Sequence, residues 1–160
     1  MRKSDKTRVR RYEARDVLYL VKIIGEEVPK LPNYKGVVVD PERVRFLLQQ
    51  NLNNDGYFAG FLLVTDPGDV IVGGIAAYCV TLVFSWDRLV GDMFLFIRPE
   101  WRTLPNATKL VKAYIDWGKA RKAAIITASH TGGTHETGMD LFLKGMDFQP
   151  IGKLYHYRRP

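Results

Sequence analysis

Residues 95–117, LFIRPEWRTLPNATKLVKAYIDW, decide the fold, because an apolar strand and a long amphipathic helix meet here within one short loop. The run before Pro99 is apolar, and from residue 107 onward apolar side chains recur at the spacing of one helix face. The first turn of such a helix presents unpaired backbone N–H groups at the positive end of the helix dipole. With Arg102 beside it, the junction is a candidate phosphate site. Every strand–loop–helix unit shares this geometry, so the pattern alone does not identify a ligand.

The rest of the chain alternates between strand and helix patterns. Helix signals include Asp16 as a candidate cap for the first helix, which Pro29 ends, and the pair Asp40-Pro41 at the start of the second. We expect strands at 7–13, 57–65, 70–84, 89–97, 123–129 and 148–159, and helices at 16–28, 40–52 and 139–147. A further long helix starts at Pro105 and carries residues 107–119. This order predicts a single domain, residues 1–160, with a mixed α/β sheet and helices on both faces.

Composition places the chain among globular proteins, with 46% hydrophobic and 26% charged residues. The longest apolar run, residues 70–86, is rich in β-branched and aromatic residues, which is typical of a buried strand rather than a membrane span. The N-terminal residues lack the apolar segment of a secretory signal, and Cys79 is the single cysteine. We therefore expect a reducing cytoplasm, no internal disulfide and no membrane association.

The net charge of +7 favours an anionic partner, such as nucleic acid, a phosphorylated cofactor or an acidic protein. Basic residues crowd both ends of the chain: Arg2, Lys3, Lys6, Arg8, Arg10, Arg11, Arg158 and Arg159. Solvated termini are the alternative interpretation. The stacking aromatics that single-stranded nucleic acid requires are not grouped on one strand face, which disfavours that partner.

Residues 96–123, FIRPEWRTLPNATKLVKAYIDWGKARKA, resemble the acetyl-CoA-binding motif of the GCN5-related N-acetyltransferases. That motif has an apolar strand, Pro-Glu-aromatic-Arg, a glycine-containing loop and a helix that ends near a Trp. Residues 139–159 are similar to the family's closing helix and strand, and the resemblance covers nearly the whole chain. It implies a mostly antiparallel central sheet in the order β-α-α-β-β-β-α-β-α-β. In its C-terminal spacing the chain resembles small acetyltransferase-like proteins of tailed phages.

Two positions depart from the family pattern. Pro105 stands where relatives have the middle glycine of the loop. A proline suits a helix start, where its missing N–H costs the helix nothing, but it removes one donor from the anion site. Loss of a hydrogen bond to a charged group is worth roughly 1.5–3 kcal/mol, so cofactor affinity would fall without vanishing. Leu143 stands where many relatives carry a tyrosine general acid, so another group must supply that proton.

Acetyl transfer to an amine requires a base for the amine proton, a polarised thioester carbonyl and a proton for the departing thiolate. Asp92, at the start of strand 89–97, is the candidate base; its alternative reading is a surface acid. His130 follows strand 123–129 and is a candidate base or proton shuttle, or simply an exposed loop residue. Tyr155 is a candidate replacement for the missing acid, or a packing residue.

The resemblance also implies which residues hold acetyl-CoA. The strand would run beside the pantetheine arm, with the backbone N–H of Phe96 or Ile97 polarising the carbonyl. The implied cofactor contacts are Phe96, Ile97, Arg102, Thr103, Leu104, Asn106, Ala107, Thr108 and Glu136. His130 and His135 have no Cys or acidic partner at ligand spacing, so we expect no metal site.

We therefore expect an acetyl-CoA-dependent N-acyltransferase that acts on an amine of a small molecule or on a protein lysine or N-terminus. The alternative is a fold relative without catalysis that binds a host protein or nucleic acid through its basic surface. A homodimer is left open, and the cytoplasm would be that of the host if a phage encodes the chain.

Overall fold

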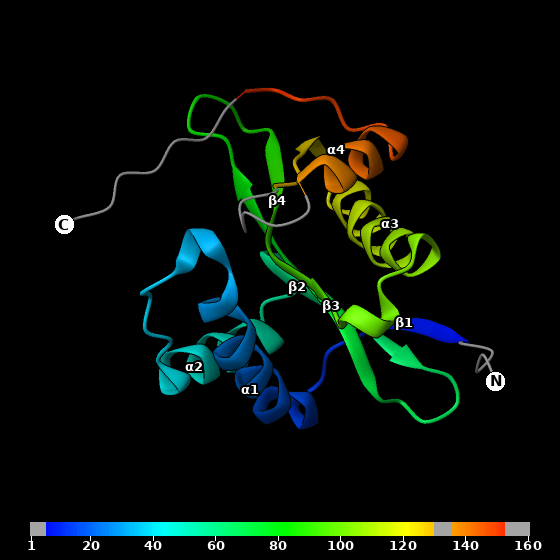
Figure 1. Cartoon of the computed structure of the whole chain (residues 1–160). Coiled ribbons are helices and arrows are strands. Elements are labelled where there is room, and N and C mark those ends of the chain that lie inside the picture. Colours follow the sequence, from blue (N-terminus) through cyan, green and yellow to red (C-terminus); the bar gives the residue numbers. More distant parts are fainter. Residues whose placement is uncertain (1–5, 130–135, 153–160) are drawn as a thin grey trace.

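The computed structural model describes residues 6–129 and 136–152, in which five strands form one sheet between two groups of helices (Figure 1). The strands are β1 (Thr7–Arg11), β2 (Phe58–Thr65), β3 (Ile71–Thr81), β4 (Arg88–Ile97) and β5 (Ala123–Ile126). The α-helices are α1 (Val17–Glu27), α2 (Pro41–Leu52), α3 (Leu104–Ala120) and α4 (Glu136–Gly145). Short 3-10 turns lie at Ala14–Asp16, Val28–Lys30, Pro32–Tyr34 and Pro99–Trp101.

The sheet has the order β1-β2-β3-β4-β5. Its first three pairings are antiparallel, and β4 pairs with β5 in parallel. Helices α1 and α2 cover one face, while α3 and α4 lie on the other (Figure 1). The expected mixed, mostly antiparallel sheet with helices on both faces is confirmed.

The core has two parts because side chains alternate across each strand. Along β2, Phe61 and Leu63 belong to the cluster on the α3 face, which includes Leu110, Tyr114 and Trp117. The intervening residues of β2 belong to the cluster on the α1 face, together with Leu20 and Ile23 of α1. The sheet is therefore held from both sides, which fixes its register.

The start of α2 follows the sequence prediction. The Asp40 carboxylate accepts hydrogen bonds from the backbone N–H groups of Glu42, at 2.9 Å, and Arg43, at 3.2 Å. Pro41 occupies the first turn, where its missing N–H has no helical partner to lose. Local signals of this kind are satisfied within one turn, so they do not depend on the rest of the fold.

Three expectations require correction. The strand predicted at 123–129 ends at Ile126 and is not buried, since β5 lies at the edge of the sheet formed by the described residues and Ile125 is 41% exposed. The described part of the strand predicted at 148–159, residues 148–152, is not in a strand; the remainder lies outside the described residues. Asp16 makes no capping hydrogen bond to α1, because its carboxylate is held by Arg10 instead.

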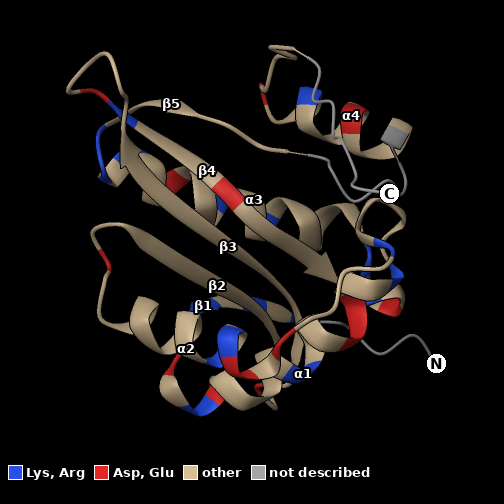
Figure 2. Cartoon of the chain, turned by 90° about the vertical axis from the view of Figure 1, so that its left-hand side faces the viewer, with Lys and Arg blue, Asp and Glu red and all other residues tan. Residues whose placement is uncertain are grey.

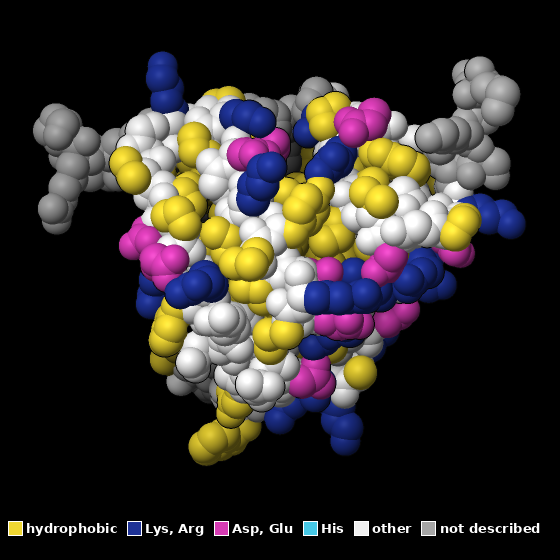
Figure 3. All heavy atoms as spheres, turned by 90° about the horizontal axis from the view of Figure 1, so that it is seen from below, with side chains coloured by type: hydrophobic (Ala, Val, Ile, Leu, Met, Phe, Trp, Pro, Cys, Tyr) yellow, Lys and Arg dark blue, Asp and Glu magenta, His cyan; other side chains and the backbone are white. Residues whose placement is uncertain are grey.

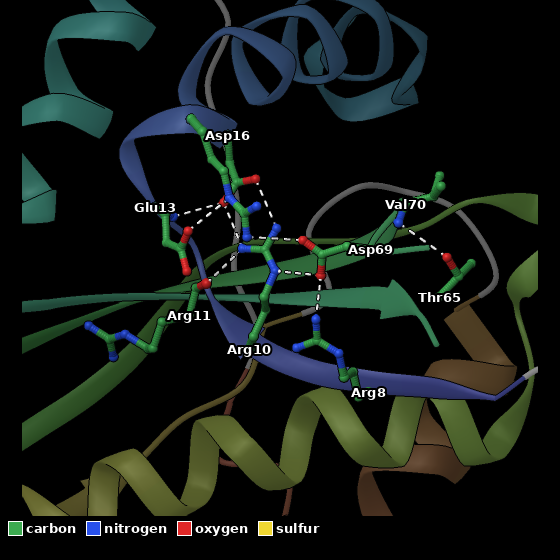
Figure 4. Close-up of polar contacts among 9 residues, drawn as sticks. Arg8, Arg10, Arg11, Glu13, Asp16, Thr65, Asp69 and Val70 are labelled. Carbon is green, nitrogen blue, oxygen red and sulfur yellow. Dashed lines mark hydrogen bonds and ion pairs between the residues drawn. The ribbon is translucent and has the colours of Figure 1, made fainter. Parts of the chain in front are cut away.

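An ion-pair network joins β1, the start of α1 and the β2–β3 turn (Figure 4). The Arg10 guanidinium donates to both carboxylate oxygens of Asp16, at 2.7 and 2.9 Å, and its Nε donates to Asp69 at 3.0 Å. Arg8 and Arg15 also donate to Asp69. Burial alone would raise the pKa of Asp16, but the hydrogen bonds from Arg10 and the Glu13 N–H lower it below its usual 3.8.

These pairs change the interpretation of the basic N-terminal segment. Arg8, Arg10 and Arg11 form ion pairs with acidic side chains of this same chain. On the face seen from below, Lys and Arg side chains lie beside Asp and Glu side chains rather than in a patch of one sign (Figure 3). These arginines are therefore neutralised by acidic side chains of the same chain and do not form a free docking surface for an anionic partner.

Replacing Asp16 by Asn should lower the free energy of unfolding by about 3 kcal/mol, because it leaves the nearly buried Arg10 guanidinium without its bidentate partner. The lowered pKa means that this stabilisation is present above pH 3.8 and is lost as the pH falls through the folded-state value. Urea denaturation of both proteins between pH 3 and pH 7 measures both effects.

Asp140→Asn is the matched control, since Asp140 pairs with Lys144 on an exposed face of α4 and should contribute less than about 1 kcal/mol. Equal stability losses in the two variants would show that the network is not structural.

Candidate functional site

A β-bulge interrupts β4 near its middle. Ala77 of β3 pairs with Asp92, whereas Ala76 pairs with Phe94, so Met93 is an extra residue on β4. A bulge bends its strand and redirects the neighbouring side chains. Here it places Met93 on the α1–α2 face and leaves Asp92 on the face of α3.

At the same level β5 leaves β4. The two strands pair only from Arg88 to Val90 on β4, and the last ladder contact is the Thr127 N–H donating to the Val90 carbonyl at 2.8 Å. Beyond Val90 the strands diverge, as Figure 2 shows from the side. From the bulge to Ile97, β4 is paired with β3 alone among the described residues.

The register determines which backbone groups of β4 face this open side. The Arg98 N–H donates to the Val72 carbonyl of β3 at 2.9 Å. Because N–H and C=O groups alternate in direction along a strand, Phe96 also faces β3, whereas Leu95 and Ile97 face away from it. Of the two candidate carbonyl polarisers, the Ile97 N–H points to the open side and the Phe96 N–H points into the sheet.

Asp92 lies where the strands part. Its carboxylate accepts hydrogen bonds from the Ser129 backbone N–H, at 2.7 Å, and from the Ser129 hydroxyl, at 3.0 Å. Burial raises the pKa of Asp92 above 3.8, and these two bonds oppose that rise without cancelling it. A half-buried carboxylate whose pKa is raised is a candidate general base.

Tyr114 of α3 lies beneath the place where β4 and β5 part, and it contacts both strand ends. Its side chain is fully buried, and its hydroxyl is shared between the carbonyl oxygens of Val90, at 3.2 Å, and Thr127. Burial raises the pKa of Tyr114, and the charge of Asp92 raises it further, so the group is a neutral donor. The sequence indicated Tyr114 only as a residue of the apolar helix face, although a hydroxyl on that face signals a buried partner.

The start of α3 offers fewer free amides than the sequence suggested. The N–H groups of Arg102 and Thr103 donate to Pro99 and Trp101, and those of Asn106 and Ala107 donate to the Thr103 hydroxyl and carbonyl. Pro105 has no N–H. The Leu104 N–H alone in this turn has no partner among the described residues.

The side chains of this turn also have structural partners. Arg102 donates from Nε to the Ile97 carbonyl at 2.8 Å, and its exposed terminal nitrogens are left for another acceptor. The Asn106 side chain is buried, with its amide donating to Trp101 and its oxygen accepting from Thr7. Thr108 is half-buried, with no hydrogen bond from its hydroxyl among the described side chains.

The remaining candidates lie at or beyond the limits of the described structure. His130 and Tyr155 lie outside the described residues, and Glu136 is described only as the first residue of α4. Within the described part, no group of three His, Cys, Asp or Glu side chains is placed to hold a metal ion. Nor does that part contain a helix with the length and apolarity needed to cross a membrane.

The opposite face of the sheet carries a pocket that borders the bulge, here called the apolar pocket. Its walls come from α1 and α2, and its floor from β2, β3 and β4. It opens to solvent, and Met93 and Phe94 form its edge at the bulge.

No protein-family model matches the chain, and no curated protein matches its sequence. Solved structures match it over nearly its whole length. An aminoglycoside N-acetyltransferase in complex with CoA aligns with a TM-score of 0.74 at 16% identity, over 99% of this chain and 98% of that one. An aminoglycoside acetyltransferase from an uncultured soil metagenomic sample, in complex with sisomicin, aligns at 0.70 and 17%, over 96% and 95%. Glucosamine-6-phosphate N-acetyltransferase from Arabidopsis thaliana aligns at 0.70 and 10%, over 96% and 100%.

At these sequence identities, the structural similarity shows the fold of this chain and nothing more specific. The chain has the mixed α/β fold of the GCN5-related acetyltransferases, as residues 96–123 indicated. A tailed-phage type is not addressed by these structures.

Proposed function

We propose that this protein transfers an acetyl group from acetyl-CoA to an amine. The observation that carries the proposal is the divergence of β4 and β5 at a bulge, with the half-buried Asp92 carboxylate where they part. The fold of the solved acetyltransferases, one of them in complex with CoA, supports the same assignment.

The residues at the open edge of β4 fit the cofactor in part. The outward backbone groups of Leu95 and the outward N–H of Ile97 can pair with an amide-containing arm, and the Leu104 N–H with the exposed Arg102 guanidinium can contact a pyrophosphate. When bound, acetyl-CoA supplies the acetyl thioester. Thr103, Asn106 and Ala107 hold the start of α3 through their hydrogen bonds. Direct contacts of the cofactor with these three residues, with Thr108 and with Glu136 stay predictions.

In the proposed reaction, the amine nitrogen bonds to the acetyl carbon, the carbon–sulfur bond breaks, and CoA leaves as the thiolate. Asp92 takes the proton that the amine loses, directly or through a water, while Ser129 holds the carboxylate in place. The Ile97 N–H faces the side on which the carbonyl oxygen would be polarised. The proton for the thiolate is assigned by the sequence to His130 or Tyr155, and that role stays a prediction.

A catalytically impaired binding module is the second candidate. The self-satisfied amides at the start of α3 and Pro105 favour it, because they leave few donors for a pyrophosphate. Against a nucleic-acid or host-protein role, Arg8, Arg10 and Arg11 are paired within the chain. A protein acceptor, a homodimer, a phage origin and a cytoplasmic location stay predictions from the sequence.

Acetyl-CoA at 100 times its Kd should raise the Tm by about 5–10 °C, since such saturation contributes about 2.7 kcal/mol to a chain of this size. Differential scanning fluorimetry measures the shift, and release of the CoA thiol over a panel of amines measures turnover. Acetyl-pantetheine, which lacks the pyrophosphate, should produce a smaller shift.

Arg102→Ala should weaken acetyl-CoA binding by about tenfold, the value of one charge-assisted contact. Arg45→Ala removes an exposed arginine of α2 and should leave the shift unchanged. A cofactor-induced shift without turnover would select the binding module, and no shift at millimolar acetyl-CoA would reject both cofactor-based functions.

A further inference from the structure

We propose that the apolar pocket takes a small monoamine with an apolar or aromatic body, and not a polycation. The inference rests on the proposed acetyl transfer and adds the chemical class of the acceptor. It is carried by the composition of the pocket, by its position at the bulge and by the charge of the whole chain.

The floor of the pocket is built from residues with little or no side chain. Gly60, Gly74, Ala76 and Ala77 form the floor between aromatic walls. A methyl group added at Gly60 would lie 2.5 Å from the Tyr12 ring, and one at Gly74 would lie 3.0 Å from the Phe96 ring. The glycines therefore let these rings lie close against the sheet, which makes a flat, apolar bed suited to a ring or a short hydrocarbon chain.

The polar groups of the pocket are few. None of the residues that line it is Asp, Glu, Lys, Arg or His. The Tyr12 hydroxyl donates to the Leu48 carbonyl at 2.8 Å, so it is occupied. The Asn51 side chain, at the end of α2, has no hydrogen-bond partner among the described residues and is left as a neutral contact for the ligand.

A polycation would be poorly held here. Each ammonium group taken from water into an apolar site costs several kcal/mol unless a carboxylate pairs with it, and the pocket lining supplies none. The net charge of +7 adds a long-range repulsion. Aminoglycosides carry several ammonium groups, so sisomicin, which is bound to one structural neighbour, is a poor acceptor for this chain.

One amine has a place at the edge of the pocket. Met93 and Phe94 border the pocket at the bulge, and Asp92 is the residue before Met93. A monoamine can therefore leave its apolar body against the rings of Phe94 and Phe96 and present its nitrogen where the strands part. The carboxylate that would take the proton lies on the far side of the same bulge.

The test is an NMR titration of the full chain, without acetyl-CoA, with 2-phenylethylamine and with sisomicin as probes. We expect 2-phenylethylamine to bind at least tenfold more tightly and to shift the methyl signals of Leu20, Ile24 and Leu48, which line the pocket. Leu110, on the opposite face, is the internal control. Sisomicin binding as tightly, binding by neither probe, or shifts confined to the Leu110 side would each overturn the assignment.

A matched pair of variants adds a second readout. Ala76→Trp fills the floor of the pocket and should weaken 2-phenylethylamine binding at least tenfold, whereas Ala124→Trp, at an exposed position of β5, should not change it. Equal affinities in the two folded variants would overturn the assignment. If Ala76→Trp does not fold, the methyl shifts of the parent chain decide the assignment. Selective binding without CoA release in the presence of acetyl-CoA would support the pocket chemistry and reject only the transfer reaction.

Discussion

Replacing Asp92 by Asn should lower kcat for acetyl transfer by about 10²–10⁴-fold, the contribution of a positioned general base. The asparagine keeps the size of the side chain but cannot accept the amine proton, so cofactor binding and folding should change little. Steady-state release of the CoA thiol measures kcat, and the acetyl-CoA-induced Tm shift measures binding. Asp116→Asn, on an exposed position of α3, is the matched control and should keep full activity.

The pH profile tests the same role independently. A base acts in its ionised form, so kcat/KM should fall as the pH drops through the pKa of Asp92, which burial raises above 3.8. Ser129→Ala removes the hydroxyl donor that favours the charged carboxylate, which should move this acidic limb to higher pH while the plateau at alkaline pH is kept. Full activity in Asp92→Asn, or an unchanged acidic limb in Ser129→Ala, would remove Asp92 from the proposed chemistry.

Replacing Tyr114 by Ala should lower the free energy of unfolding by about 3–5 kcal/mol, the loss typical of a large aromatic removed from a core. The side chain is fully buried between α3 and the sheet, and its hydroxyl joins the carbonyls of Val90 and Thr127 where β4 and β5 part. Both the apolar packing and this polar link would be lost. Urea denaturation followed by circular dichroism measures the change.

Tyr114→Phe separates the two contributions. It keeps the ring and leaves the Thr127 carbonyl without this donor, which should cost about 1–3 kcal/mol. Tyr57→Ala removes an exposed tyrosine, 61% accessible, and should stay within about 0.5 kcal/mol of the parent protein. If Tyr114→Phe is as stable as the parent, the hydroxyl does not hold the two strands together.

The junction at residues 95–117 was predicted in outline, but its hydrogen bonds were not. Apolar periodicity located α3, and Pro105 correctly marked its first turn. The expectation of several free amides was wrong. The Thr103 hydroxyl accepts a hydrogen bond from the Asn106 N–H, and the N–H groups of Arg102 and Thr103 donate to carbonyls of the preceding 3-10 turn. Which of several oxygens takes an N–H group depends on loop conformation, and residue type alone does not fix it.

Asp16 and β5 illustrate a second kind of limit. The sequence pattern made Asp16 a helix cap, since only its neighbours along the chain were considered, yet a bidentate pair with Arg10 is stronger than a cap. The apolar run after residue 122 indicated a buried strand, yet its burial depends on how many neighbours it has in the sheet. Within the described part of the chain β5 has β4 alone as a neighbour, and Ile125 is exposed.

The sequence by itself determined the order of helices and strands from β1 to α4, the starts of α2 and α3 and the mixed α/β class, because periodicity and capping act between residues a few positions apart. Only the tertiary structure decided the site. Asp92 and Ser129 are 37 residues apart, and they meet because a bulge turns β4 just where β5 departs from it. The position of this bulge depends on how β4 pairs with β3 and packs against the helices on both faces, which is a property of the assembled sheet and not of either strand alone.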